Sequence, residues 1–317
     1  MTVDQVIFAR YSGETARIIF APLFIGLARD YFKDLDISIS IVEPEEQPWV
    51  TVAEGRADCG PGYIDYCARP ELYGRIKAVA VHEQFRPGHG ITTLLARTAL
   101  VENGELTGYQ SLRGKTIGLA GGRGDDYMAF YGALQQGGLT INDVRVVPAS
   151  HGGTDRKRAI LNEEMDLVIG RRPRGVATEV SQGHVVRWKI GDEVYPNLQA
   201  RFILFNAGFI RERPGVGSRF LAAYLRGARD YCNAFDKGLG TPEMIDFLIR
   251  ETGEPLQLLQ TMKPVGFTAN GLIDMPRLES EVKVLVERGL FPKNIKLAEV
   301  VDNRFAETAL KDLGEYR

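Results

Sequence analysis

The sequence predicts an α/β protein in which short apolar strands alternate with helices over most of the chain, a pattern typical of mostly parallel sheets. Its clearest unit is a βαβ motif at 111–150, where apolar strands at 116–120 and 144–147 flank a glycine-rich corner, a helix and a Gly-Gly stop. Two apolar, β-rich segments, 91–96 and 201–205, each join one α/β block to the next. We therefore expect two α/β lobes with a ligand cleft between them.

The individual elements follow from local patterns along the chain. Apolar β-rich runs that end in glycine or proline turns predict strands. The expected strands lie at 6–9, 37–42, 57–62, 77–82, 91–96, 116–120, 144–147, 167–170 and 201–205. Apolar-rich stretches, most of which begin near Ser, Thr or Pro, predict helices. The expected helices lie at 16–32, 50–55, 218–235, 242–251, 255–262 and 276–288, besides the helix of the βαβ motif.

The two β-rich segments set the expected domain boundaries. If residues 94–205 form an inserted lobe, the chain leaves the first lobe near 91–96 and re-enters it near 201–205. The first lobe then comprises 1–93 and 206–317, and a mostly helical tail completes it.

Composition and charge exclude several classes of protein. The 317 residues are 44% hydrophobic and 25% charged, with a net charge of −2, as is ordinary for a globular chain. Basic residues are interspersed with acidic ones, so no basic and aromatic strip suits a nucleic acid. The apolar runs are too short to span a bilayer. No spacing of His, Cys, Asp and Glu is typical of a metal site. We therefore expect no nucleic-acid partner, no transmembrane segment, no metal and no cofactor.

The amino-terminal segment and the cysteines give information about the cellular compartment of the protein. The opening MTVDQVIFARYSG lacks the basic start and the long apolar core of a signal peptide. The sequence as written therefore predicts a cytoplasmic protein, or a periplasmic or extracytoplasmic one if a leader was removed. Three cysteines cannot form a fully paired disulfide framework, and Cys59 and Cys67 are expected to be small core residues.

Several motifs are shared with one known family. An apolar stretch at 21–28 runs into Tyr31-Phe32 and the strand at 37–42. Further matches follow in order over nearly the whole chain: Glu54-Gly55-Arg56-Ala57-Asp58, Ser111-Leu112-Arg113-Gly114-Lys115-Thr116, Asn142-Asp143-Val144, Asn162-Glu163-Glu164-Met165-Asp166-Leu167 and Phe209-Ile210 before Pro214. The chain resembles the type II periplasmic-binding-protein fold, in the NMT1/THI5-like branch of ABC-transporter substrate-binding proteins that includes sulfonate-binding and thiamine-pyrimidine-precursor proteins. The resemblance implies a two-lobed clamp that closes on a small molecule.

Candidate ligand contacts lie in the loops at the carboxyl ends of the strands, where an open α/β sheet exposes its crevice. The first lobe would contribute Tyr11, Ser12, Glu14, Gly60, Gly62, Tyr63, His82 and Glu83. The second lobe would contribute Gly122, Arg123, Tyr127, Ser150, His151 and Arg171.

The glycine-rich corner at 121–124 predicts an anion site, because bare backbone N–H groups and the helix dipole would face the ligand there. Arg123 can grip a carboxylate or sulfonate with two hydrogen bonds. Asp125 and Asp126 limit the negative charge that the corner would accept, which favours a ligand with a single acidic group. Tyr127 is the aromatic residue favoured to cover an aromatic ring or an aliphatic chain of that ligand.

Two function classes stay open at this level. One is a binding protein that delivers a small organic acid or sulfonate, with or without an aromatic ring, to an ABC permease. The other is a cytoplasmic, cofactor-free lyase or hydrolase that uses His82, His151 and Glu14 as acid and base groups. The turn at 11–14 lacks the cysteine that the resemblance implies for an aromatic-sulfinate desulfinase. The segment at 199–208 likewise lacks the cysteine-rich loop of the pyrimidine-forming proteins.

Overall fold

The computed structural model describes residues 3–89, 92–119, 124–149, 154–171, 173–261 and 263–317. These residues form two compact units, each built on its own sheet of five strands. The first unit comprises Met1–Gln84, Gln199–Leu256 and Phe267–Arg317. The second comprises Phe85–Leu198 and Gln257–Gly266.

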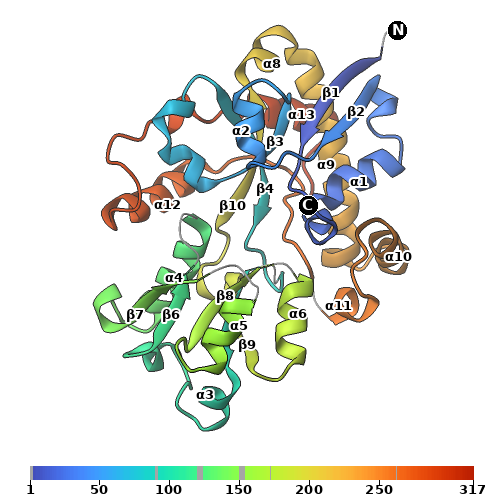
Figure 1. Ribbon diagram of the computed structural model, residues 1–317. Helices are drawn as coiled ribbons and strands as arrows, with labels where there is room; N and C mark the ends of the chain where they lie inside the picture. Colours follow the sequence, from blue (N-terminus) through green and yellow to red (C-terminus); the bar gives the residue numbers. More distant parts are fainter. Residues whose placement is uncertain (1–2, 90–91, 120–123, 150–153, 172, 262) are drawn as a thin grey trace. The chain divides into compact units, whose positions relative to one another are not determined.

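The sheet of the first unit has the strand order β2-β1-β3-β10-β4 (Figure 1). Its strands are β1 (Asp4–Ala9), β2 (Ile37–Val42), β3 (Cys59–Tyr63), β4 (Ile76–Gln84) and β10 (Gln199–Asn206). Strands β2, β1 and β3 are parallel, whereas β10 runs antiparallel to both β3 and β4. The start of β10 therefore lies beside the ends of β3 and β4.

The first unit contains a long amphipathic helix, α9, with one buried apolar face. The helices of this unit are α1 (Ala21–Ala28), α2 (Pro48–Ala53), α8 (Ala207–Glu212), α9 (Pro214–Lys237), α10 (Thr241–Thr252), α12 (Met275–Glu287) and α13 (Arg304–Leu313). Of these, α1, α8, α10 and α13 contact α9. Both α1 and α13 lie against α9 (Figure 1). The α1–α9 crossing depends on Gly227, because a Cβ there would lie 2.1 Å from the carbonyl oxygen of Pro22.

The single helix expected at 16–32 is divided in the structure. A 3-10 helix, η1 (Glu14–Phe20), leads into α1, which ends at Ala28. Pro22 stands in the first turn of α1, the helical position where its missing N–H costs nothing. Asp30 then takes a left-handed backbone conformation with φ of 56°, which ends the helical segment before Phe32.

The sheet of the second unit has the order β7-β6-β8-β5-β9. Its strands are β5 (Thr92–Arg97), β6 (Thr116–Leu119), β7 (Arg145–Pro148), β8 (Leu167–Arg171) and β9 (Val185–Ile190). Its helices are α3 (Thr98–Glu102), α4 (Gly124–Gln136), α5 (Thr154–Leu161), α6 (Pro173–Ser181), α7 (Gly191–Val194) and most of α11 (Leu256–Thr261). Because β6 and β7 are parallel and α4 connects them, the predicted βαβ motif is confirmed.

Short 3-10 helices connect several of these elements. They are η2 (Lys33–Leu35), η3 (Ile64–Ala68), η4 (Pro70–Leu72), η5 (Tyr109–Leu112), η6 (Ile141–Asp143) and η7 (Leu297–Glu299). Except for η5 and η6, they all belong to the first unit.

The chain passes from one unit to the other earlier than the expected positions near 93 and 205. It changes units after Gln84, where β4 ends, and again after Leu198, immediately before β10. Within the described residues, each β-rich segment that was expected to cross contributes a strand to one sheet, β5 to the second and β10 to the first. The segment Gln257–Gly266 adds a later excursion into the second unit that the sequence pattern did not indicate.

Candidate functional site

The first unit gathers polar and aromatic side chains at one edge of its sheet. Strands β1, β3 and β4 all end at this edge, and the antiparallel β10 begins there. The residues at these strand ends are Arg10, Tyr11, Tyr63, Glu83 and Arg201, which we call the carboxyl edge. Strand ends of this kind are where open α/β sheets bind ligands.

Arg201 lies in the middle of the carboxyl edge, in register with Tyr63 on β3 and Glu83 on β4. Its Nη1 is 2.5 Å from Oε2 of Glu83. Its Nη2 donates a 3.0 Å hydrogen bond to the Tyr63 hydroxyl, and its Cζ is 4.6 Å from the centroid of the Tyr63 ring. All three residues are at most 5% exposed. The ion pair therefore balances its own charge away from water and holds the Tyr63 ring in one orientation.

Tyr11 extends the aromatic part of the carboxyl edge. Its ring centroid is 6.1 Å from that of Tyr63 and 6.0 Å from that of Phe20 on η1. The side chain is half-buried, and its backbone carbonyl accepts a 3.1 Å hydrogen bond from Nη1 of Arg10. Two tyrosine rings thus meet at the ends of adjacent strands, with Tyr11 partly exposed and Tyr63 buried.

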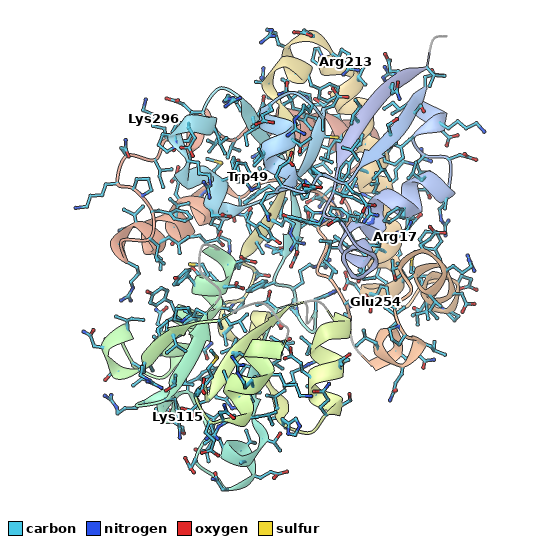
Figure 2. The ribbon with its side chains drawn as sticks, viewed as in Figure 1. Arg17, Trp49, Lys115, Arg213, Glu254 and Lys296 are labelled. Carbon is cyan, nitrogen blue, oxygen red and sulfur yellow. The ribbon has the colours of Figure 1, made fainter. Side chains whose placement is uncertain are left out.

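Arg10 is the basic residue of the carboxyl edge that directly follows β1. It is 6% exposed and forms an ion pair with Glu43, the residue after β2. Burial lowers the pKa of Arg10, Glu43 opposes this effect, and the positive charge of Arg17 adds to it. Arg17 lies on η1 (Figure 2). Its Cζ is 4.9 Å from the centroid of the Phe24 ring.

His82 is placed in the core of the first unit. It is 2% exposed, and its ring centroid lies 6.1 Å from that of Phe20 and 5.1 Å from that of Phe267. The Tyr224 hydroxyl and His82 Nδ1 are joined by a 2.7 Å hydrogen bond. Burial and the nearby positive charge of Arg201 hold the pKa of His82 well below its ordinary value, so the ring is neutral near pH 7.

Gly60 and Gly62 lie inside β3, whereas the sequence pattern placed them in the glycine-rich turn that ends the strand expected at 57–62. A Cβ on Gly60 would lie 2.8 Å from the carbonyl oxygen of Ala9. A Cβ on Gly62 would lie 2.4 Å from the Leu204 side chain. Both glycines are therefore required for strand packing. Ser12, in the loop after β1, is exposed.

The candidates of the second unit are only partly described. Tyr127 on α4 is half-buried, and its ring stacks on Tyr131 with centroids 6.2 Å apart. Arg171 ends β8. The remaining candidates fall outside the described residues: Gly122, Arg123, Ser150 and His151. The side chains of Glu14 and Arg171 are likewise outside the described part of the structure.

Asp125 and Asp126 open α4, and the structure buries both almost completely, at 1% and 0% exposure. Their carboxylates therefore lie within the protein, in the first turn of a helix whose dipole favours negative charge there.

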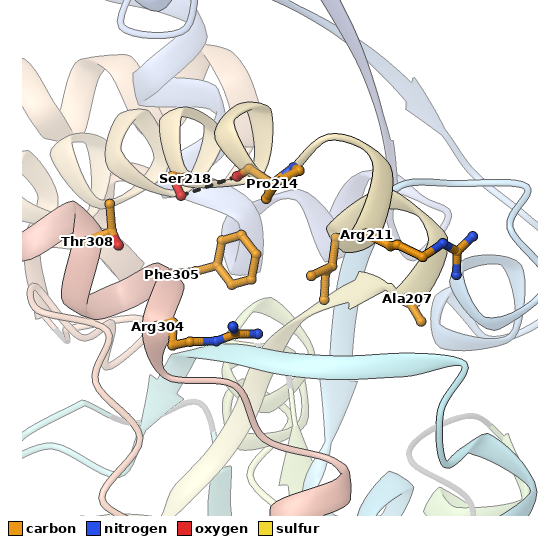
Figure 3. Close-up of a pocket in the computed structure, with 8 residues that line it drawn as sticks. Ala207, Arg211, Pro214, Ser218, Arg304, Phe305 and Thr308 are labelled. Atoms are coloured by element: carbon orange, nitrogen blue, oxygen red, sulfur yellow. Dashed lines mark hydrogen bonds between the residues drawn. The ribbon is translucent and has the colours of Figure 1, made fainter.

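A separate pocket of about 500 Å³ lies near the end of β10, at the opposite edge of the first sheet (Figure 3). Its lining comes from α8, α9 and α13: Ala207, Ile210, Arg211, Pro214, Ser218, Arg304, Phe305 and Thr308. Arg211 pairs with Glu212 and Arg304 with Asp302, each at 2.7 Å. Both arginine charges at this pocket are therefore balanced by neighbouring carboxylates.

The described part of the chain shows neither a metal site nor a membrane-spanning helix. No group of three or more His, Cys, Asp or Glu residues in these segments is arranged to hold a metal ion. None of the helices described is long and apolar enough to cross a membrane.

Arg10, Arg17 and Arg201 are residues of the candidate site that sequence reasoning did not single out. Arg201 opens the apolar run RFILF, and Arg10 directly follows the strand VIFA. A lone charge at the end of a buried strand was the available signal for both. Arg17 gave no signal, because it lies within a stretch expected to be a regular helix.

Comparison with known proteins assigns the chain to a family. The model of the NMT1/THI5-like family matches residues 18–234, more than half of the chain. The protein belongs to the NMT1/THI5-like family. The riboflavin-binding protein RibY of Chloroflexus aurantiacus is 25% identical over 233 residues, which cover 72% of this chain. The matched part spans about 63% of the length of RibY.

Solved structures show the fold of this NMT1/THI5-like protein. The periplasmic aliphatic sulphonate binding protein SsuA of Escherichia coli aligns with a TM-score of 0.69 and 15% identity, over 93% of this chain and 91% of SsuA. The desulfurization enzyme DSZB aligns with a TM-score of 0.63 and 12% identity, over 97% and 99%. The chain therefore has the type II periplasmic-binding-protein fold, as the sequence predicted, and this fold occurs in binding proteins and in an enzyme.

Proposed function

We propose that this protein is the substrate-binding component of an ABC-type importer, and that it binds a small organic acid or sulfonate at the carboxyl edge. The observation that carries the proposal is the arrangement of Arg201, Glu83 and Tyr63 beside Tyr11. It combines an oriented aromatic surface with polar groups at strand ends, as ligand sites in α/β sheets require. The family match and the names of RibY and SsuA support a binding role.

An importer component meets its ligand outside the cytoplasm, so we propose a periplasmic or extracytoplasmic location and a permease as partner. The share of the second unit in binding stays a prediction that rests on Arg123, Tyr127, His151 and Arg171.

The described residues support catalysis less well than binding. His82, one of the proposed acid and base groups, is a neutral core residue bonded to Tyr224. The Cys59 thiol is buried within β3, and burial raises its pKa well above the ordinary value, which disfavours the thiolate. A nucleophile or base that a ligand could reach is therefore not found among these groups.

Ligand binding and turnover can be tested together. The purified protein is examined by native mass spectrometry for a co-purified small molecule. It is then titrated calorimetrically with riboflavin, hexanesulfonate and benzoate, and each mixture is checked for products after prolonged incubation. We expect micromolar or tighter binding of at least one compound and no conversion. Conversion of a bound compound would contradict the receptor role, and so would the absence of any bound or binding molecule.

A variant pair locates the site. Tyr11→Ala removes an aromatic ring from the carboxyl edge and should weaken binding at least tenfold. Tyr73→Ala is the matched control, because Tyr73 precedes β4 and thus lies at the opposite edge of the sheet. It should change the affinity less than twofold. Equal losses in both variants would exclude the carboxyl edge as the binding site.

A further inference from the structure

Arg10 at the carboxyl edge and Arg17 on η1 approach the same aromatic ring. The Cζ of Arg10 lies 5.9 Å from the centroid of the Phe24 ring, and the Cζ of Arg17 lies 4.9 Å from it. Arg10 directly follows β1. Arg17 lies on η1, which leads directly into α1, and Phe24 on α1 is 6% exposed. An aromatic face near a guanidinium stabilises the cation and restricts its orientation.

In both guanidinium groups the Nε–H is a donor that remains available to a ligand. The Nε atoms of Arg10 and Arg17 are buried, and neither has a hydrogen-bond acceptor among the residues that the structure describes. A buried donor without an acceptor is costly and uncommon in native proteins, so it calls for an explanation. An oxyanion bound beside Phe24 would supply the missing acceptor oxygens.

The balance of charge around the carboxyl edge also favours binding of an anion. Glu43 balances Arg10, and Glu83 balances Arg201. Within the described side chains, Arg17 has no carboxylate partner, although it lies near enough to Arg10 to act on its pKa. One positive charge is thus unbalanced, which matches a ligand with one negative charge.

We propose that Arg17, with Arg10 beside it, binds the acidic group of the ligand and makes the site selective for a singly charged oxyanion such as a carboxylate or sulfonate. This inference rests on the proposed function and adds to it the residue that recognises the charge. Phe24 holds the two guanidinium groups in place, and the Tyr11 and Tyr63 rings receive the uncharged part of the ligand.

The test compares two ligands that differ in charge. Benzenesulfonate and benzenesulfonamide have the same ring and similar volume, but only the first is an anion at pH 7. Both are titrated calorimetrically into the wild type, Arg17→Gln and Arg17→Lys. The control is Arg226→Gln, which removes another arginine that stacks on a ring, with its Cζ 4.0 Å from the centroid of Tyr31.

We expect the wild type to bind the sulfonate at least tenfold more tightly than the sulfonamide. Arg17→Gln should abolish this preference and leave sulfonamide affinity within twofold, because a neutral side chain removes only the interaction with charge. Arg17→Lys should keep part of the preference, since the charge remains and the planar fork is lost. Arg226→Gln should bind both compounds as the wild type does.

Several results would overturn the inference while leaving the function standing. These are a wild type that binds riboflavin or the sulfonamide at least as well as the sulfonate, or an Arg17→Gln variant that keeps its preference for the anion. Equal loss of both ligands, in a variant whose unfolding midpoint matches the wild type, would also overturn it. Failure of the proposed function looks different, because native mass spectrometry and the wider titrations would then detect no ligand at all.

Discussion

The Arg201 guanidinium both stacks on the Tyr63 ring and donates a 3.0 Å hydrogen bond to its hydroxyl, while its other nitrogen pairs with Glu83. This relationship ties β3 to β4 through β10, the strand between them. A buried ion pair is weak evidence for stability in itself, because desolvation offsets much of the attraction. Its effect here is to fix the position of an aromatic ring at the edge where a ligand is expected.

Removal of one partner of this ion pair should destabilise the protein strongly. In Glu83→Gln the buried Arg201 charge loses its ion pair with Glu83, and we expect the free energy of unfolding to fall by about 3–5 kcal/mol. Urea unfolding followed by circular dichroism measures the loss. Glu287→Gln is the control, since Glu287 pairs with Lys283 at the surface and should cost less than about 1 kcal/mol. Similar small losses in both variants would contradict the buried pair.

Glu281 should make stability depend on pH. It is fully buried between Arg277 and the backbone N–H of Gln199, and burial raises its pKa to about 7 from an ordinary 4.5. Because the folded state binds this proton more tightly than the unfolded state, the contribution of Glu281 is complete below about pH 4.5. It is lost as the pH rises through 7.

A comparison with Glu281→Gln isolates this effect. The unfolding free energy of the wild type relative to the variant should decline between pH 4.5 and 7 by an amount on the order of 3 kcal/mol. Urea unfolding of both proteins at several pH values measures the difference. A constant difference across this range would show that Glu281 has the same pKa in the folded and unfolded states.

The hydrogen bond between Tyr224 and His82 should stabilise the core of the first unit. Tyr224→Phe removes the hydroxyl and leaves Nδ1 of a buried imidazole without its partner, which should cost about 1–3 kcal/mol. Tyr316→Phe, which loses a bond to Asn233 at a partly exposed position, should cost less. Chemical denaturation of both variants tests the difference, and a neutral effect of Tyr224→Phe would indicate that water or another group replaces the bond.

The close approach of α1 and α9 can be tested with two glycines of the same helix. Gly227→Ala forces a methyl group against the carbonyl oxygen of Pro22 and should destabilise the protein by about 1–3 kcal/mol. Gly215→Ala adds a methyl group with no atom within 4 Å, so helix propensity should leave stability unchanged or slightly higher. Thermal unfolding of the two variants measures this difference in stability. Equal unfolding midpoints would show that α1 and α9 move apart at no cost.

Much of the architecture follows from the sequence because it depends on local patterns. The strand at 37–42 is an uninterrupted β-rich segment, and it forms β2 over those residues. The βαβ motif at 111–150 is likewise set by adjacent apolar strands, a glycine corner and a helix stop. The prediction of one helix over 16–32 is wrong, because Pro22 lies in the first turn of a separate helix and the left-handed Asp30 ends the helical segment.

The set of residues that meet at the carboxyl edge could be identified only from the tertiary structure. Tyr63 was a candidate from its position after a strand, but Arg201 lies 138 positions further along the chain and joins it only because β10 inserts antiparallel between β3 and β4. Strand order depends on long-range packing, which local periodicity does not encode. Gly60 and Gly62 show the same limit, since the neighbouring strands that exclude a side chain there are remote in sequence. The sequence by itself thus determined the class of fold and the strand ends at which to look, and the packing of remote strands decided which charges and rings meet there.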